Sequence, residues 1–538
     1  MSAPTASEPT PWTRTDALIA GLLAVCAWLL RPADAGLCHF DEGAYACSAL
    51  AIAQGQFPAA MHPGQPLLSP PLYFTLCGLL MRLVGTHSEQ VLLQVSSVAG
   101  ALCAPMLFGL GRACLGRAAG AVAGLLLALS QLQAGFATMA LTDPLFLLCF
   151  LLALWLLWRA EQARSLILAA CAGLAVGLAW NTKYHGWLAL VVAAPAVLWH
   201  ARVDGVRALA AAALRLAVAA GVAGAAFLPW FWFVQSQPGG YAAVVQQQRQ
   251  FLREWRAALA HGADQLGYVA FLDAWWWGPL LSCAALALGW RRPLVLLALL
   301  PLAAAALLHS ATLALAGAAL LALPLVLRQQ GGGLLVVGWC AVFTVLTPLY
   351  HPYPRLLLPW HAAVCLLAGA ALAWWGQARP RAGWILMGWL AAATLGALLL
   401  PGGLGALHAT FARTSLRTVA DALAPALTPA DVPVAVLGEP ALVFHLRQAG
   451  RQAFHLNSPR DLPVGRDLFL ITGLYAERAP GVAQWLAAHQ SELQPAATHE
   501  WAAPDLRRID DSKPGALLWP DSAPPRYRFV AQRVRLTK

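Results

Sequence analysis

The sequence predicts an α-helical polytopic membrane protein with about thirteen transmembrane helices and a small C-terminal α/β domain outside the membrane. The chain has 538 residues, of which 59% are hydrophobic and only 11% are charged, and its mean hydropathy is +0.62. A soluble globular protein carries roughly 25% charged residues. These values exclude a soluble enzyme, a disordered chain and a small disulfide-rich domain.

Charged residues are distributed unevenly along the chain. They are more than twice as dense in residues 402–538 as in residues 1–401, and a Pro401-Gly402-Gly403 breaker separates the two parts. We therefore expect a transmembrane domain at 1–401 and a soluble domain at 402–538. The second part contains the strand and helix patterns of an α/β domain. The strands are expected at 432–437, 467–472 and 526–536, and the helices at 442–447 and 483–489.

Apolar runs in the first part are long enough to cross a membrane, which takes about 20 mainly apolar residues or fewer where neighbouring helices support a shorter span. Thirteen runs qualify: 17–30, 91–111, 118–136, 143–158, 166–182, 185–199, 216–234, 273–290, 294–308, 311–327, 332–349, 356–376 and 383–400. The run at 71–84 follows prolines and contains Arg82. We expect it to lie flat at the membrane interface.

Lysine and arginine residues in the short loops set the orientation. They favour the side of the N-terminus by nearly two to one, so the positive-inside rule places the N-terminus in the cytoplasm. Thirteen spans then place the C-terminal domain outside, in the periplasm if the membrane is a bacterial inner (plasma) membrane. Two long loops, 31–90 and 235–272, lie on the same external side. This pattern accounts for the net charge of +11, so we expect membrane lipids and no nucleic acid as partners.

Carboxylates stand at the external ends of two segments. Asp41 and Glu42 are adjacent in the first external loop, and Asp143 opens the fourth span. Acidic residues are favoured at helix N-termini, and Thr142 or Asp143 can cap a helix, so a structural explanation stays open. A positioned carboxylate is also what general base catalysis requires. We identify Asp41, Glu42 and Asp143 as candidate catalytic residues.

Two cations occupy external turns between spans. Lys183 and Arg355 either reach to lipid phosphates or stabilise a phosphate leaving group on a lipid. Together with the carboxylates, they suit a reaction in which a carboxylate activates a hydroxyl group and the cations hold a departing phosphate. Aromatic residues on the same side are candidates for substrate binding. They are Tyr45, Tyr73, Tyr184, His185 and Tyr353.

These residues fall within an ordered set of short motifs over about residues 17–360. The motifs are Asp41-Glu42-Gly43-Ala44-Tyr45, Pro70-Pro71-Leu72-Tyr73, Gly111-Arg112 through Gly116-Arg117, Thr142-Asp143-Pro144-Leu145, Thr182-Lys183 and Tyr353-Pro354-Arg355. The set resembles the GT-C glycosyltransferases that use polyprenyl-phosphate sugars. This family includes the protein O-mannosyltransferases and the bacterial lipid A aminoarabinose transferase.

The resemblance implies a membrane glycosyltransferase. Such an enzyme transfers a hexose or pentose, with inversion, from a polyprenyl-phosphate donor to a lipid, glycan or protein acceptor on the external face. By the resemblance, Asp41 matches the catalytic base and Asp143 a second acidic residue, while Lys183 and Arg355 match donor-phosphate contacts. The sequence departs from the family pattern at Leu68-Ser69, where relatives often carry lysine or histidine, and at Leu356, where tyrosine is usual.

Two further points stay open at this level. Some members of the family bind a divalent metal ion, and Glu42, His62 and His261 are possible ligands, but they lack metal-type spacing. We therefore leave the metal unknown and predict no certain cofactor. The alternative function is a transporter or flippase of a lipid-linked glycan. It would favour charges within spans and internal repeats, whereas the spans contain almost no charge and we find no repeat.

Overall fold

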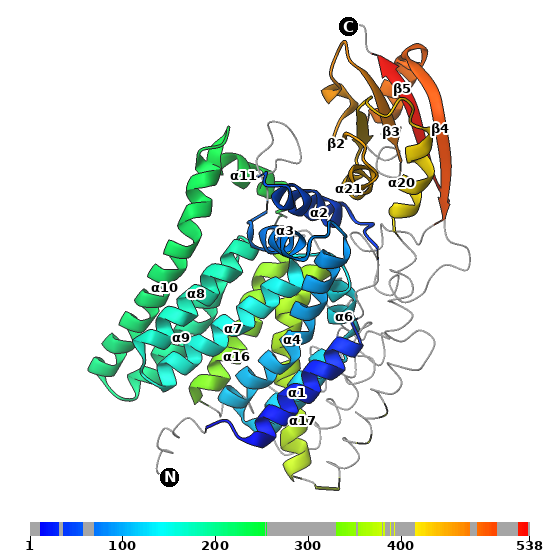
Figure 1. The fold of residues 1–538 in the computed structure, drawn as a ribbon. Coiled ribbons are helices and arrows are strands. Elements are labelled where there is room, and N and C mark those ends of the chain that lie inside the picture. The colour runs from blue at the N-terminus through cyan, green and yellow to red at the C-terminus, as the bar shows by residue number, and fades with distance from the viewer. Residues whose placement is uncertain are drawn as a thin grey trace.

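The computed structural model of the chain describes residues 11–31, 36–56, 69–252, 330–350, 353–378, 415–473, 481–502 and 526–535, together with a few single positions. Within these residues a helix bundle carries a five-stranded sheet at one end (Figure 1). The start of the first helix lies at the opposite end of the bundle from the sheet (Figure 1). The two ends therefore offer different surroundings, and the candidate site residues gather at the end with the sheet.

The bundle consists of apolar helices whose small residues allow close packing. Its helices are α1 (Arg14–Leu29), α4 (Gln90–Leu115), α5 (Arg117–Ala128), α6 (Gln131–Ala137), α7 (Asp143–Gln162), α8 (Leu166–Thr182), α9 (Leu188–Arg202), α10 (Val206–Gln235), α16 (Gln330–Leu346) and α17 (Leu358–Ala378). A Cβ atom at Gly111 would lie 2.7 Å from the Cα atom of Gly120. This glycine pair brings the backbones of α4 and α5 together, as small residues do between membrane helices.

Five segments among the described residues are long and apolar enough to cross a membrane. They are Gln90–Leu115, Asp143–Gln162, Val206–Gln235, Gly331–Leu349 and Pro354–Ala378. The α5–α6 pair adds a sixth if it forms one span. The predicted runs at 273–290, 294–308 and 311–327, and nearly all of 383–400, lie outside the described residues. The helical character of the bundle is thus established, and the number of thirteen spans stays a prediction.

The predicted run 118–136 is not one straight helix. The chain bends by 56° between α5 and α6, where the Ser130 side chain caps α6 by accepting from the N–H of Gln133. The guanidinium group of Arg31 donates to the carbonyl oxygens of Leu127 (3.1 Å) and Ala128 (3.0 Å). These carbonyl groups belong to the last turn of α5, where the helix offers them no N–H group four residues further on. The fully buried Arg31 therefore stabilises the break.

Two short helices, α2 (Phe40–Ala53) and α3 (Leu72–Val84), lie across the end of the bundle that carries the sheet (Figure 1). Tyr73, Cys77 and Met81 of α3 are fully buried, whereas Leu79 and Leu83 are 54% and 81% exposed. A helix with apolar residues on both faces, one packed and one open, fits a position at the membrane interface. This arrangement agrees with the flat helix expected for 71–84.

The C-terminal sheet has the strand order β2-β1-β3-β5-β4. Its strands are β1 (Val434–Leu437), β2 (Ala453–Leu456), β3 (Asp467–Thr472), β4 (Leu493–Ala502) and β5 (Arg526–Arg535). Strands β1, β2 and β3 pair in parallel, and β5 pairs antiparallel with β3 and β4. The predicted strands and helices of this region correspond to β1, β3, β5, α21 (Pro440–Gln448) and α22 (Val482–Ala488). Strands β2 and β4 and helix α20 (Arg417–Leu423) were missing from the prediction.

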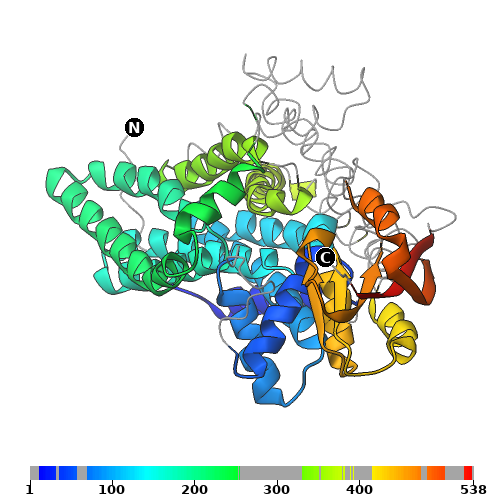
Figure 2. The ribbon, with the colours of Figure 1, turned by 90° about the horizontal axis from the view of Figure 1, so that it is seen from above.

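Both faces of the sheet are covered by helices. Val434, Val436 and Phe469 pack with residues of α20 and α21, whereas Leu468 and Leu470 pack with Val482 of α22. The alternation follows from the two-residue period of a strand, which turns successive side chains to opposite faces. Seen from above, the sheet lies on the side of the bundle away from α10 (Figure 2).

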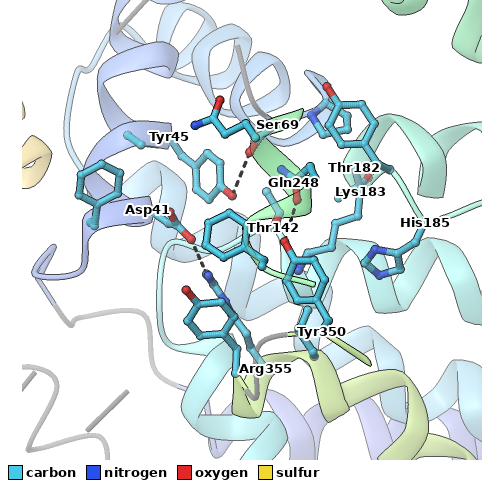
Figure 3. Close-up of a pocket in the computed structure, with 18 of the residues that line it drawn as sticks. Asp41, Tyr45, Ser69, Thr142, Thr182, Lys183, His185, Gln248, Tyr350 and Arg355 are labelled. Atoms are coloured by element: carbon cyan, nitrogen blue, oxygen red, sulfur yellow. Dashed lines mark hydrogen bonds and ion pairs between the residues drawn. The ribbon is translucent and has the colours of Figure 1, made fainter. Parts of the chain in front are cut away.

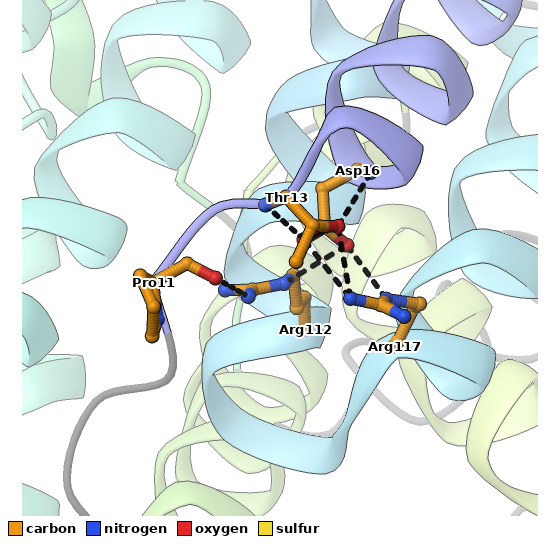
Figure 4. A network of polar contacts seen from close by, with 5 residues as sticks. All are labelled: Pro11, Thr13, Asp16, Arg112 and Arg117. Carbon is orange, nitrogen blue, oxygen red and sulfur yellow. Dashed lines mark hydrogen bonds and ion pairs between the residues drawn. The ribbon is translucent and has the colours of Figure 1, made fainter.

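A charge cluster around the buried Asp16 ties the start of α1 to the end of α4 and the start of α5 (Figure 4). The carboxylate of Asp16 is fully buried and lies 3.2 Å from the guanidinium of Arg112 and 2.7 Å from that of Arg117. It also accepts from the backbone N–H and hydroxyl of Thr13. A buried carboxylate requires such complete pairing. Arg112 and Arg117 therefore have a structural role beside their contribution to the positive charge of this side.

Candidate active site

A cavity of about 680 Å³ lies where α2 meets turns at one end of the bundle (Figure 3). Its walls come from segments that are far apart in the sequence. They include the start of α2, the turn Thr182–His185 after α8, the end of α11 (Gly240–Arg249) and the segment between α16 and α17. Three of the charged residues singled out in the sequence, Asp41, Lys183 and Arg355, line it together.

Asp41 and Arg355 form an ion pair across the cavity wall. The Nη1 atom of Arg355 lies 2.5 Å from Oδ2 of Asp41, although the two residues are 314 positions apart in the sequence. Asp41 stands in the first turn of α2, and the N-cap position belongs to His39, whose Nδ1 accepts from the backbone N–H of Asp41. The carboxylate of Asp41 therefore faces the cavity and does not cap the helix.

Glu42 has different surroundings from its neighbour and does not line the cavity. Its side chain is buried, and Oε2 accepts from the backbone N–H groups of Cys38 (3.0 Å) and His39 (2.8 Å). Its Oε1 accepts from the N–H of Ala140 at 2.8 Å. These bonds complete a capping box at the start of α2 and join it to the segment before α7. This geometry gives Glu42 a structural role outside the cavity lining, and a catalytic role for it stays a prediction.

Asp143 and Lys183 form a second ion pair beside the first. The Nζ atom of Lys183 lies 2.5 Å from Oδ1 of Asp143, which is buried at the start of α7 and behind the cavity surface. Thr142 occupies the N-cap position of α7 without a capping bond from its side chain. Lys183 ends α8 in an extended conformation, so its side chain leaves the helix toward the cavity. Asp143 thus does not line the cavity itself and acts on it only through its ion pair with Lys183.

The charges of the two pairs act on one another. Burial disfavours the charged carboxylate of Asp41, but nearby positive charge, chiefly that of Arg355, outweighs this effect and lowers the pKa of Asp41. Burial lowers the pKa of Lys183, and the nearby negative charge of Asp143 compensates only in part. Burial also lowers the pKa of His185 to about 3, with a further contribution from Lys183. The cavity therefore has an ionised Asp41 and a neutral His185 in its wall.

Four of the five predicted substrate-binding residues line the cavity. They are Tyr45, Tyr184, His185 and Tyr353. The fifth, Tyr73, is fully buried, and its hydroxyl group contacts the carbonyl oxygen of Leu92 at 3.0 Å and the hydroxyl of Ser96 at 2.8 Å. Tyr73 is therefore a packing residue of α3 outside the cavity lining, and its contact with substrate stays a prediction.

Several neutral residues of the cavity were not identified from the sequence. They include Ser69, Gln247, Gln248, Phe251, Tyr350 and Asn457. Neutral polar side chains carry no strong penalty at a membrane surface, so they do not stand out as charges do. The run Gln246-Gln247-Gln248 in an external loop was the one available signal. Ser69, at the position of a family departure, contacts the hydroxyl of Tyr45 at 3.4 Å.

The C-terminal sheet region meets the cavity directly. Asn457, one residue after β2, lines it. Helix α21 packs against α2, and a Cβ atom at Gly43 would lie 1.9 Å from the backbone nitrogen of Ala441. The ring of Phe40 makes an edge contact with that of His455 at 5.4 Å between centroids. The helix that carries Asp41 is therefore held between the bundle and the sheet.

Of the three possible metal ligands, only Glu42 lies in the described part of the chain. Glu42 is engaged by backbone N–H groups, and His62 and His261 lie outside the described residues. Within the described ranges, no group of three or more histidine, cysteine or acidic side chains is arranged to hold a metal ion.

Residues 68–232 match the family described as dolichyl-phosphate-mannose-protein mannosyltransferase. The structure is similar to that of ArnT from Cupriavidus metallidurans bound to undecaprenyl phosphate, with a TM-score of 0.59 and 16% sequence identity over 96% of this chain and 97% of that chain. The chain has the GT-C glycosyltransferase fold. The resemblance expected from the sequence is thereby confirmed.

Other structures with the GT-C fold agree. The apo form of ArnT from Cupriavidus metallidurans matches with a TM-score of 0.56 and 16% identity over 96% of this chain and 97% of that chain. The oligosaccharyltransferase of Archaeoglobus fulgidus in its apo form matches with a TM-score of 0.56 and 12% identity, over 90% of this chain and 73% of that chain. Comparison of the sequence with curated proteins gives no match. The similarity is thus carried by the fold and by the family match at 68–232.

Proposed function

We propose that this protein is an inverting glycosyltransferase that moves a hexose or pentose from a polyprenyl-phosphate donor to a hydroxyl group of a lipid, glycan or protein. The observation that carries the proposal is the convergence of Asp41, Lys183 and Arg355 on one cavity. Each comes from a different segment, and a general base with two cations is what this reaction needs. The resemblance to proteins that bind polyprenyl phosphates supports the same donor class.

The reaction follows from these groups. Asp41 accepts the proton of the acceptor hydroxyl, whose oxygen forms a bond to the anomeric carbon of the sugar. The bond between that carbon and the phosphate oxygen breaks on the opposite face, and the electron pair leaves with the lipid phosphate. Lys183 and Arg355 stabilise the negative charge that develops on this phosphate. Asp143 positions Lys183 through their 2.5 Å contact.

The ion pair between Asp41 and Arg355 supports an order of binding. While the guanidinium group contacts the carboxylate at 2.5 Å, Asp41 is a weaker base, because its proton affinity is lowered. A donor phosphate offers Arg355 a second anionic partner. When the donor phosphate binds Arg355, the guanidinium group interacts less strongly with Asp41. The proton affinity of Asp41 then rises, and Asp41 becomes an effective base once the donor is in place.

The setting proposed for this reaction is the external face of a bacterial inner membrane. Helix α2, whose start lines the cavity, lies at the end of the bundle opposite the start of α1 (Figure 1), and the positive-inside rule places that start in the cytoplasm. We assign residues 1–401 to the transmembrane domain and residues 402–538 to a periplasmic domain. Acceptors would then reach the cavity from the periplasm or from the outer leaflet.

The variant Asp41→Asn tests this function. We expect at least a 100-fold loss of transfer, because general base catalysis contributes roughly 10²–10⁴-fold and an amide cannot accept the proton. The measurement is release of undecaprenyl phosphate from undecaprenyl-phosphate-linked hexoses and pentoses in native membrane vesicles, which supply the acceptors. Asp204→Asn is the matched control, because Asp204 pairs with Arg164 on an exposed turn. Full activity of a folded Asp41→Asn protein would refute the mechanism.

A further inference from the structure

A carboxamide and a hydroxyl group form a hydrogen-bonded pair inside the cavity. The hydroxyl of Tyr350 donates to Oε1 of Gln248 at 2.7 Å, and both residues line the cavity (Figure 3). Gln248 lies near the end of α11, and Tyr350 follows the short helix η2 (Thr347–Leu349). The catalytic groups proposed above do not include this pair.

The backbone and neighbouring rings fix the pair in place. Leu252 and Tyr350 form an antiparallel bridge between the two segments. The ring of Phe251 lies 5.7 Å from that of Tyr350 and 6.4 Å from that of Tyr353. The guanidinium group of Arg355 in turn lies 4.9 Å from the ring of Tyr353. A continuous row of side chains therefore connects Gln248 with the proposed phosphate contact Arg355.

The pair presents the polar pattern that a sugar requires. Burial raises the pKa of Tyr350 to about 12, so the hydroxyl keeps its proton and directs it to Gln248. The amide nitrogen of Gln248 can then donate, and the oxygen of Tyr350 can accept. A donor and an acceptor side by side match two neighbouring hydroxyl groups. The ring of Phe251 adds an apolar surface for the carbon–hydrogen face of a sugar ring, as pockets for small molecules combine apolar walls with a few polar groups.

We infer that Gln248 and Tyr350 recognise neighbouring hydroxyl groups on the sugar of the donor and select a neutral sugar. The inference rests on the proposed function, because it requires the donor phosphate at Arg355. It extends that function by assigning the sugar to α11 and the segment before α17. A merely structural role for the pair, holding α11 against this segment, would affect every ligand of the cavity equally.

Binding of purified full-length protein to two kinds of lipid tests the inference. The probes are undecaprenyl phosphate, and undecaprenyl phosphate linked to mannose, arabinose or 4-amino-4-deoxyarabinose. We expect Gln248→Ala and Tyr350→Phe to weaken binding of the best neutral sugar lipid about tenfold, the value of one lost hydrogen bond in a buried site. Binding of undecaprenyl phosphate itself should change less than about twofold. Gln246→Ala is the matched control, since Gln246 is exposed on the same helix.

The variant Gln248→Glu gives a result that a structural role cannot produce. A carboxylate binds an ammonium group more strongly than a carboxamide does, so the ratio of affinities for the aminoarabinose and arabinose lipids should rise about tenfold. An unchanged ratio, or equal weakening of all lipids including undecaprenyl phosphate, would overturn the inference. Failure of the wild-type protein to bind undecaprenyl phosphate at all would instead overturn the proposed function, and the inference with it.

Discussion

Asp41 and Glu42 are adjacent carboxylates whose side chains have separate surroundings. Successive residues of a helix point about 100° apart, so Asp41 faces the cavity while Glu42 turns into the junction with the segment before α7. The sequence reveals both as unusual acidic residues at a membrane surface. It could not separate them fully, because one of the three N–H groups from which Glu42 accepts a hydrogen bond belongs to Ala140, 98 positions away.

The variant Glu42→Gln should lower stability more than it impairs chemistry. Glutamine keeps one acceptor oxygen and places an NH₂ group against backbone N–H groups, which leaves buried donors without acceptors. Such a defect costs about 1–3 kcal/mol, and thermal unfolding in detergent measures it. Glu500→Gln should change stability by less than about 0.5 kcal/mol, because Glu500 and Arg526 are exposed. A stable but inactive Glu42→Gln protein would identify Glu42 as the base.

At the scale of elements, apolar runs predicted helices better than their ends and bends. The runs 143–158, 166–182 and 216–234 correspond to α7, α8 and α10, because long apolar segments leave little alternative to a helix in a membrane. The break between α5 and α6 depends on Arg31, which stands almost 100 residues earlier. The neutral residues that line the cavity were not predicted for the same reason, because their contacts also join distant positions of the sequence. Gln248 and Tyr350 form a hydrogen bond across 102 positions of the sequence, so neither residue by itself indicates the pair.

The contact between α2 and α21 gives an element-scale prediction. In Gly43→Ala, the new Cβ atom would lie 1.9 Å from the nitrogen of Ala441 and 2.4 Å from the carbonyl carbon of Pro440, so the two helices must separate. Because α2 carries Asp41, and displacement of a reacting group by about 1 Å can cost 100-fold in rate, we expect a loss of transfer of that order. The vesicle assay and thermal unfolding check this expectation.

Gly224→Ala is the control for this variant. A Cβ atom at Gly224 of α10 meets nothing within 4 Å, and alanine is the better helix former by about 1 kcal/mol. This control should therefore keep its activity and its stability. If Gly43→Ala behaved in the same way, the sheet would not be what holds α2 in its active position.

At the scale of the whole molecule, charged groups gather at the two ends of an apolar bundle. Asp16 pairs with Arg112 and Arg117 at one end (Figure 4). The ion pairs Asp41–Arg355 and Asp143–Lys183 lie at the other end. The described part of the bundle also contains a buried pair between Glu161 and Arg215, at 2.5 Å. Ionic groups within a membrane protein are costly unless they are paired. The pairing therefore explains how these charges are retained. The cavity exposes both members of one pair, Asp41 and Arg355, and only Lys183 of the other.

This separation of ends leads to a prediction about topology. The start of α1 and Arg117 share one end through Asp16, whereas β5 lies at the other end together with α2 (Figure 1), whose start lines the cavity. Because Arg14, Arg112 and Arg117 all lie at the first end, the positive-inside rule assigns it to the cytoplasm. An alkaline phosphatase reporter, active only outside the cytoplasm, should therefore be active when fused after Lys538 and inactive when fused after Arg117. A cytoplasmic fluorescent reporter should give the reverse pattern at the same two positions. Phosphatase activity after Arg117 alone would invert the molecule and place the cavity in the cytoplasm, where acceptors of the external face could not reach Asp41.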